Sequence, residues 1–111
     1  MATISNLYVD AGATYSNIIT VTASNGQALN LSGYTVASQM RKSYQSSTAY
    51  AFTASVYDAS TGKIRLQLTP TQSEGIPAGR WLYDVEITSA SGTKSRVVEG
   101  IVTVNPQITQ I

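Results

Sequence analysis

The stretch that decides the fold is Arg80-Trp81-Leu82-Tyr83-Asp84-Val85-Glu86-Ile87, together with the run Arg96 to Val104 that follows it. In the first stretch every second residue is a large apolar or aromatic one, a period of two that is typical of a β-strand with one buried face. The second run alternates in the same way, and Ser91-Gly92 between the two suits a two-residue turn. The two runs therefore predict a hairpin whose apolar face turns toward a core.

Closing this hairpin at Ser91-Gly92 fixes which residues lie opposite one another, because a shift by one residue would turn every apolar side chain to the wrong face. The register puts Tyr83 opposite Gly100, which predicts that the glycine leaves room for the ring. The expected pairs are Val85 with Val98, Tyr83 with Gly100, Trp81 with Val102 and Asp84 with Glu99.

Period-two alternation continues along the rest of the chain, and no segment shows the apolar spacing of a long helix. The sequence therefore predicts an all-β fold: a single seven-stranded antiparallel β-sandwich of immunoglobulin-like type over residues 1–111, with short N- and C-terminal tails. The expected strands lie near Leu7–Val9, Ile18–Ala23, Tyr34–Arg41, Tyr50–Tyr57, Lys63–Leu68, Arg80–Thr88 and Lys94–Val104.

One short helical turn is expected over Pro70–Glu74. Thr69 suits the N-cap, proline is favoured at the first helical position, and Gln72 stands where a capping box needs an amide or a carboxylate. Gly75 should end the turn, and Ile76 should close the end of the core.

Composition narrows the function. The 111 residues include no cysteine and no histidine, which excludes disulfide scaffolds, zinc fingers and Ser-His or Cys-His catalytic pairs. We therefore expect a chain that is not an enzyme, with no catalytic residues, no cofactor, no metal ion and no small-molecule substrate. A net charge of +1 gives no footprint for nucleic acid. Only 12% of residues are charged, whereas 28 are serine or threonine, a surface suited to close packing in an assembly.

No apolar run reaches the roughly 18 residues of a membrane span, and the first residues lack the pattern of a signal peptide. The sequence therefore predicts a protein made in the cytoplasm, with no membrane partner.

Half of the six acidic residues should share one patch, because Asp84 and Glu86 project from one face of their strand and Glu99 lies opposite Asp84. The pattern favours a solvated or interface face, then a docking patch for a basic partner, then a calcium site. A glycosidase-like pair comes last, since an open sheet face offers no cleft for catalysis. Basic residues such as Lys63 and Arg65 should lie elsewhere, so we expect subunits to dock head-to-tail.

Aromatic residues and tails supply the other interface candidates. Tyr44 and Tyr50 flank a polar loop, and exposed tyrosines are adhesive at binding sites, which favours as an alternative a carbohydrate-binding or adhesin-like module. Apolar residues in both tails predict that a terminus adds a strand to the sheet edge of a second subunit. These are Ile4 and Leu7 at one end and Ile108 and Ile111 at the other.

A series of landmarks resembles a known family. They are Leu29-Asn30-Leu31-Ser32-Gly33-Tyr34-Thr35-Val36, Met40-Arg41-Lys42, Asp58, Gly62-Lys63-Ile64, Leu68-Thr69-Pro70 and Gly79-Arg80-Trp81-Leu82-Tyr83-Asp84-Val85-Glu86-Ile87. Together they resemble small β-sandwich structural proteins of tailed-phage virions, similar to the N-terminal domain of phage baseplate upper proteins. The resemblance covers about Leu29 to Val104 and rests on core and turn positions, so no site residues carry over.

This resemblance implies a non-enzymatic, oligomeric building block that docks on a capsid, neck or baseplate. Baseplate members of the family continue into a long C-terminal region that holds a receptor-binding protein, whereas this sequence stops at Ile111. We therefore expect a decoration or adaptor subunit located in the virion, with copies of itself and other virion proteins as partners.

Overall fold

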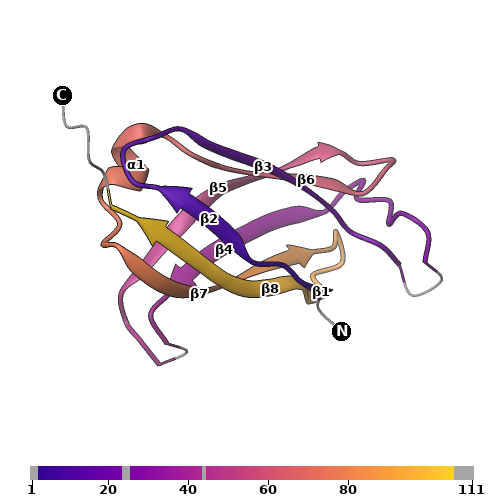
Figure 1. Ribbon diagram of the computed structural model, residues 1–111. Helices are drawn as coiled ribbons and strands as arrows, with labels where there is room; N and C mark the ends of the chain where they lie inside the picture. The colour runs from indigo at the N-terminus through magenta and orange to yellow at the C-terminus, as the bar shows by residue number, and fades with distance from the viewer. Residues whose placement is uncertain (1–2, 24–25, 44, 107–111) are drawn as a thin grey trace.

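The computed structural model describes residues 3–23, 26–43 and 45–106, and it confirms an all-β fold (Figure 1). Eight strands and one short helix follow one another in these ranges. They are β1 (Thr3–Ile4), β2 (Leu7–Asp10), β3 (Tyr15–Thr20), β4 (Thr35–Arg41), β5 (Ala49–Asp58), β6 (Lys63–Leu68), α1 (Pro70–Glu74), β7 (Gly79–Thr88) and β8 (Lys94–Asn105).

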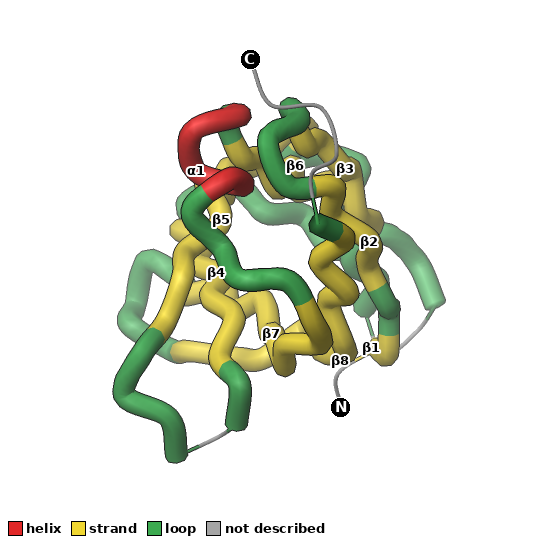
Figure 2. Tube along the Cα trace, turned by 60° about the vertical axis from the view of Figure 1, so that its left-hand side comes forward, coloured by secondary structure: helices red, strands yellow, loops and turns green. Residues whose placement is uncertain are grey.

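The strands form one continuous mixed sheet, ordered β1-β8-β7-β4-β5-β6-β3, with β2 also beside β8. The long strand β5 pairs with β4 through residues 49–52 and with β6 through residues 53–58, so the sheet folds over at β5. We call β1, β2, β8, β7 and β4 the large leaf and β6 and β3 the small leaf. The two leaves curl around the core as a half-barrel (Figure 2), in place of the two separate sheets of the expected immunoglobulin-like sandwich.

The prediction of purely antiparallel pairing is wrong at the N-terminal edge. Both β1 and β2 run parallel to β8, and in Figure 1 the arrows of β2 and β8 point the same way. The alternation in Leu7–Asp10 reports only which side chains are buried and carries no information on the direction of the neighbouring strand. The extra strand β1 also raises the count from the expected seven to eight.

The hairpin of β7 and β8 has the predicted register at all four expected pairs, from Trp81 opposite Val102 to Val85 opposite Val98. The predicted two-residue turn is wrong, however. The connection spans Ser89 to Thr93, closed by a hydrogen bond from the Ser89 amide to the Thr93 carbonyl of 2.8 Å. A β-bulge at Val97 absorbs the extra residue, so that Glu86 pairs with Arg96.

Apolar side chains from both leaves fill the space between them. Trp81 and Tyr83 point inward, as predicted, and Ile76 closes one end of the core. The helix α1 has the predicted capping box, in which the Gln72 amide donates to Thr69 Oγ1 and the Thr69 amide donates to Gln72 Oε1. Within the described residues no helix is long and apolar enough to cross a membrane.

Candidate docking face

A groove of about 540 Å³ lies on the outer face of the large leaf. Its walls come from β1, β8, β7 and β4, and Ser43 in the β4–β5 loop closes one side. The lining combines an apolar group with a charged and amide-bearing group. The apolar side chains are Ile4, Leu82 and Ile101, and the polar ones are Asn6, Gln39, Arg41, Asp84, Glu86, Arg96 and Glu99.

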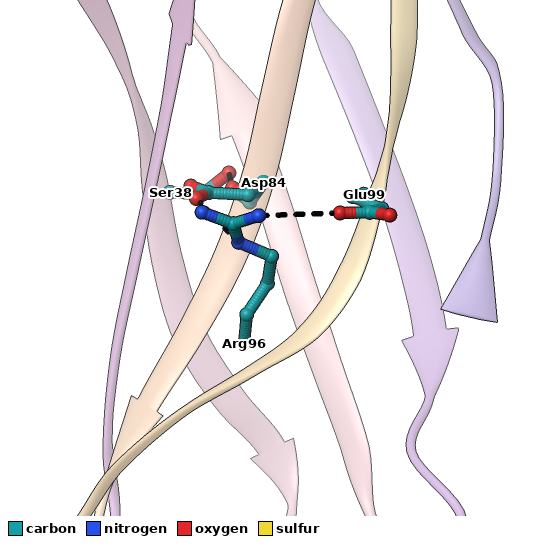
Figure 3. Close-up of polar contacts among 4 residues, drawn as sticks. All are labelled: Ser38, Asp84, Arg96 and Glu99. Atoms are coloured by element: carbon teal, nitrogen blue, oxygen red, sulfur yellow. Dashed lines mark hydrogen bonds and ion pairs between the residues drawn. The ribbon is translucent and has the colours of Figure 1, made fainter. Parts of the chain in front are cut away.

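The three acidic residues lie together in this groove, as the sequence predicts, but they surround an arginine. Arg96 Nε lies 3.1 Å from Asp84 Oδ2, and Arg96 Nη1 lies 3.3 Å from Glu99 Oε2 (Figure 3). The expectation that basic residues lie elsewhere is therefore wrong here. In an unbroken strand, residues three apart would face opposite sides, and the bulge at Val97 brings Arg96 onto the same face as Glu99.

The carboxyl group of Asp84 lies in a half-desolvated position. Burial raises the pKa of Asp84, the Glu86 carboxylate raises it further, and the Arg96 guanidinium opposes both. On the inner side of the leaf, the buried Ser38 hydroxyl donates a 2.6 Å hydrogen bond to the Asp84 carbonyl oxygen and fixes β7 against β4. In the described part of the chain, no three His, Cys, Asp or Glu side chains converge as metal ligands.

Arg41 supports the wall of the groove that is formed by β4 and the β4–β5 loop. Its Nη1 donates a 2.5 Å hydrogen bond to the Ser46 carbonyl, and its Nη2 donates to Gln39 Oε1 at 3.3 Å. The guanidinium thus ties the end of β4 to the β4–β5 loop, which contributes Ser43 to the groove.

The N-terminal segment with Ile4 and Asn6 forms the opposite wall of the groove, and a hydrogen bond from a core residue holds it in place. Between β1 and β2 the Ser5 amide donates to the Glu99 carbonyl of β8 at 2.9 Å, and the Tyr83 hydroxyl donates a 2.5 Å hydrogen bond to the Ser5 carbonyl. The Asn6 side chain accepts a hydrogen bond of 3.1 Å from the Ile101 amide. Gly100 lies beneath this crossing, where a Cβ would collide with the Ser5 carbonyl oxygen. The glycine therefore makes room chiefly for the Ser5 backbone, and the ring-space explanation was incomplete.

This anchoring separates the two N-terminal candidates. Ile4 is 73% exposed at the rim of the groove, whereas Leu7 is 4% exposed and belongs to the core. Leu7 is therefore wrong as a contact residue, because β2 turns its Leu7 side to Val102 inside the half-barrel. The N-terminal strand adds to β8 of its own chain.

The aromatic candidates do not form an open platform. Tyr50 is half-buried and packs edge-on against Trp81, with ring centroids 5.3 Å apart. Trp81 is 3% exposed and donates from Nε1 to the Pro77 carbonyl at 3.0 Å, while Lys42 Nζ lies 4.6 Å from its ring centroid. Tyr50 is thus wrong as an exposed binding residue. Tyr44 lies outside the described residues, as do Ile108 and Ile111.

Of the predicted interface residues, the structure brings together Ile4, Asp84, Glu86 and Glu99. Sequence reasoning missed Arg96, because strand parity without a bulge turns it inward. It also missed Ile101, although its alternation with Val102 would have placed it outward opposite Leu82.

No protein-family model and no curated protein matches this chain. Among solved structures, the SrpA adhesin of Streptococcus sanguinis, as its R347E mutant, matches with a TM-score of 0.51 and 14% identity, over 96% of this chain and 56% of that one. An internalin-like protein of Listeria monocytogenes matches with a TM-score of 0.48 and 14% identity, over 94% of this chain and 28% of that one. The chain thus spans about half or less of these proteins, and the likeness to SrpA concerns the fold alone.

Proposed function

We propose that this protein is a non-enzymatic structural subunit that docks onto another protein through the groove on the large leaf. The observation that carries the proposal is the composition of that groove, in which exposed apolar side chains border a partly desolvated ion cluster. Ile4 and Ile101 stand among the most exposed large apolar residues of the described chain, and both line the groove with Leu82. Apolar anchors beside an arginine are typical of the energetic centre of protein interfaces.

The walls of the groove are preorganised, which favours docking. Hydrogen bonds from Tyr83 to Ser5, from Ser38 to Asp84 and from Arg41 to Ser46 hold three of its sides. A surface that is already ordered loses less conformational entropy on association than one that must become ordered.

The setting we propose is a tailed-phage virion, with the protein as a decoration or adaptor subunit on the capsid, neck or baseplate. The support is the resemblance of the landmarks from Leu29 to Val104 and the low-charge, hydroxyl-rich composition. The absence of histidine and cysteine from the sequence and the pairing of Asp84 and Glu99 with Arg96 support a role without catalysis.

Charge reversal in the groove tests this proposal. Among the described residues Glu86 forms no salt bridge, and the lining carries three acids against Arg41 and Arg96, so we expect a basic partner group. Glu86→Lys should reduce incorporation into particles at least tenfold, whereas Glu74→Lys, the same change on α1 outside the groove, should leave it unchanged. Equal incorporation of both variants, measured by quantitative mass spectrometry of gradient-purified particles, would contradict the proposal.

A second candidate is an adhesin-like module in which the same groove binds a carbohydrate. It is favoured by the amide and carboxylate groups of Asn6, Gln39 and Glu86, which suit sugar hydroxyls, and by the similar fold of the SrpA adhesin. A glycan array distinguishes the two functions, because the docking subunit should bind no glycan, whereas the module should bind one and lose it in Gln39→Ala.

A further inference from the structure

The strand β3 is an open edge of the sheet. Within residues 3–23, 26–43 and 45–106 it pairs only with β6, from Tyr15 opposite Leu68 to Thr20 opposite Lys63, without a register shift. The Val21 amide donates to the Gly62 carbonyl at 2.7 Å, so the alternation of an antiparallel pair turns the amides of Ser16, Ile18 and Thr20 away from β6. In the described part of the chain, these outward backbone groups have no backbone partner.

This edge lacks the features that usually protect an edge strand. Residues Tyr15–Thr20 carry no charge, no proline and no bulge, and Ile18 is 43% exposed. The opposite edge is protected, because β1 and β2 are short pieces interrupted at Ser5 and β2 ends on Asp10. Edge strands without such protection are templates for the addition of another strand.

The sequence of residues 107–111 fits this edge. It reads Gln-Ile-Thr-Gln-Ile and has no charged side chain, like the six residues of β3. In an extended strand Ile108 and Ile111 fall on opposite faces. The edge of β3 offers an apolar neighbour on each face, with Ile18 outside and half-buried Ile19 inside.

We propose that residues 107–111 of one copy add as a strand to β3 of a second copy. The donor residues follow β8 of the large leaf, and the Ala11 amide donates to the Asn105 carbonyl at 3.0 Å, so the turn before β3 lies beside the point where they leave. Each subunit then donates once and accepts once, either reciprocally within a two-fold dimer or head-to-tail along a ring or filament. The inference deepens the proposed function, because it names a second copy as one partner of the structural subunit.

Because the chain has no cysteine, cross-linking between two single-cysteine variants gives a direct test. Thr20→Cys chains are mixed with Gln110→Cys chains and oxidised, and the same is done with Ser16→Cys. A covalent heterodimer should form on a non-reducing gel for a β3 cysteine. None should form for Ser47→Cys, an exposed site in the loop between β4 and β5, which is not part of β3. Absence of the heterodimer for both β3 sites would overturn the proposal.

A second measurement uses the backbone itself. Ser16→Pro removes an outward amide without removing a hydrogen bond to β6, and Ser16→Ala keeps that amide. Light scattering should give a mass of at least two subunits for the natural chain and for Ser16→Ala, and one subunit for Ser16→Pro. A monomeric natural chain would refute the proposal, and if Ser16→Pro does not fold, the cross-link decides. If cross-links fail while incorporation still depends on Glu86, the strand exchange is wrong and the docking function stands.

Discussion

At the scale of single residues, Tyr83 links the core to the wall of the groove. Its hydroxyl reaches the Ser5 carbonyl, 78 residues away in sequence, and its ring packs against Phe52 with centroids 6.1 Å apart. Burial raises the pKa of Tyr83 from 10.0 to about 12. A neutral, hydrogen-bonded phenol is therefore part of what holds Ile4 at the rim.

Replacing Tyr83 with phenylalanine should lower the free energy of unfolding by about 1–2 kcal/mol, because the Ser5 carbonyl loses its donor. In the natural protein the stabilisation by Tyr83 is complete below pH 10 and declines as the pH rises toward about 12, since the folded state holds the proton more tightly. Urea unfolding between pH 7 and pH 12 measures both effects. An unchanged alkaline decline in Tyr83→Phe would contradict this account.

Gly100→Ala should also lower the free energy of unfolding, by up to a larger amount than Tyr83→Phe, since the added methyl group collides with the Ser5 backbone. We expect a loss of about 1–3 kcal/mol, the usual range for overpacking, with detachment of the N-terminal strand. Gly75→Ala is the control, because Gly75 has a helical φ of −75° and its added Cβ would meet only ordinary contacts at 3.6 Å. Thermal unfolding of the two variants should differ clearly, and equal midpoints would refute the close approach at Gly100.

At the scale of elements, the sequence predicts well where local chemistry decides. The register of β7 and β8 follows from side-chain parity, and α1 follows from the capping residues Thr69 and Gln72. The sequence predicts poorly where one inserted residue reverses which side chains face outward, or where the paired strands are far apart in the chain. The bulge at Val97 has no sequence signal of its own, yet it turns Arg96 into the acidic patch.

The capping box of α1 gives an element-scale prediction. Thr69→Ala removes the acceptor for the Gln72 amide and should lower stability by about 1 kcal/mol. Thr71→Ala is the matched control, because the exposed Thr71 side chain has no capping role. Chemical denaturation of both variants measures the difference, and an equal effect would show that the cap does not stabilise this turn.

The bulge that turns Arg96 outward gives a second prediction at the scale of elements. Arg96→Met should raise the pKa of Asp84 further, since the guanidinium now opposes burial and the charge of Glu86. In both proteins the contribution of Asp84 to the free energy of unfolding should fall as the pH rises above 3.8, because the folded state holds the Asp84 proton more tightly than the unfolded state. In Arg96→Met this fall should continue to a higher pH than in the natural protein. Carboxyl NMR titration reports the shift. A lowered Asp84 pKa in Arg96→Met would contradict the geometry.

At the scale of the whole molecule, the two surfaces that matter lie on different leaves. The groove is on the large leaf and the open edge is on β3 of the small leaf, so one subunit offers a docking face and an edge at the same time. Composition and alternation predict the all-β fold and the grouping of Asp84, Glu86 and Glu99 on one face. The folding of the sheet at β5 and the parallel N-terminal edge depend on contacts between distant segments, which no local pattern encodes.

Hydroxyl-radical footprinting of the protein, free and bound to purified particles, tests the central claim most directly. Docking through the large leaf predicts that Ile4 and Ile101 oxidise several-fold more slowly on the particle, because a partner covers the groove. Tyr57 is exposed on β5, stacks with Arg65 and does not line the groove, so it should be oxidised at the same rate in both states. Equal oxidation of Ile4 and Ile101 in the two states would contradict the account.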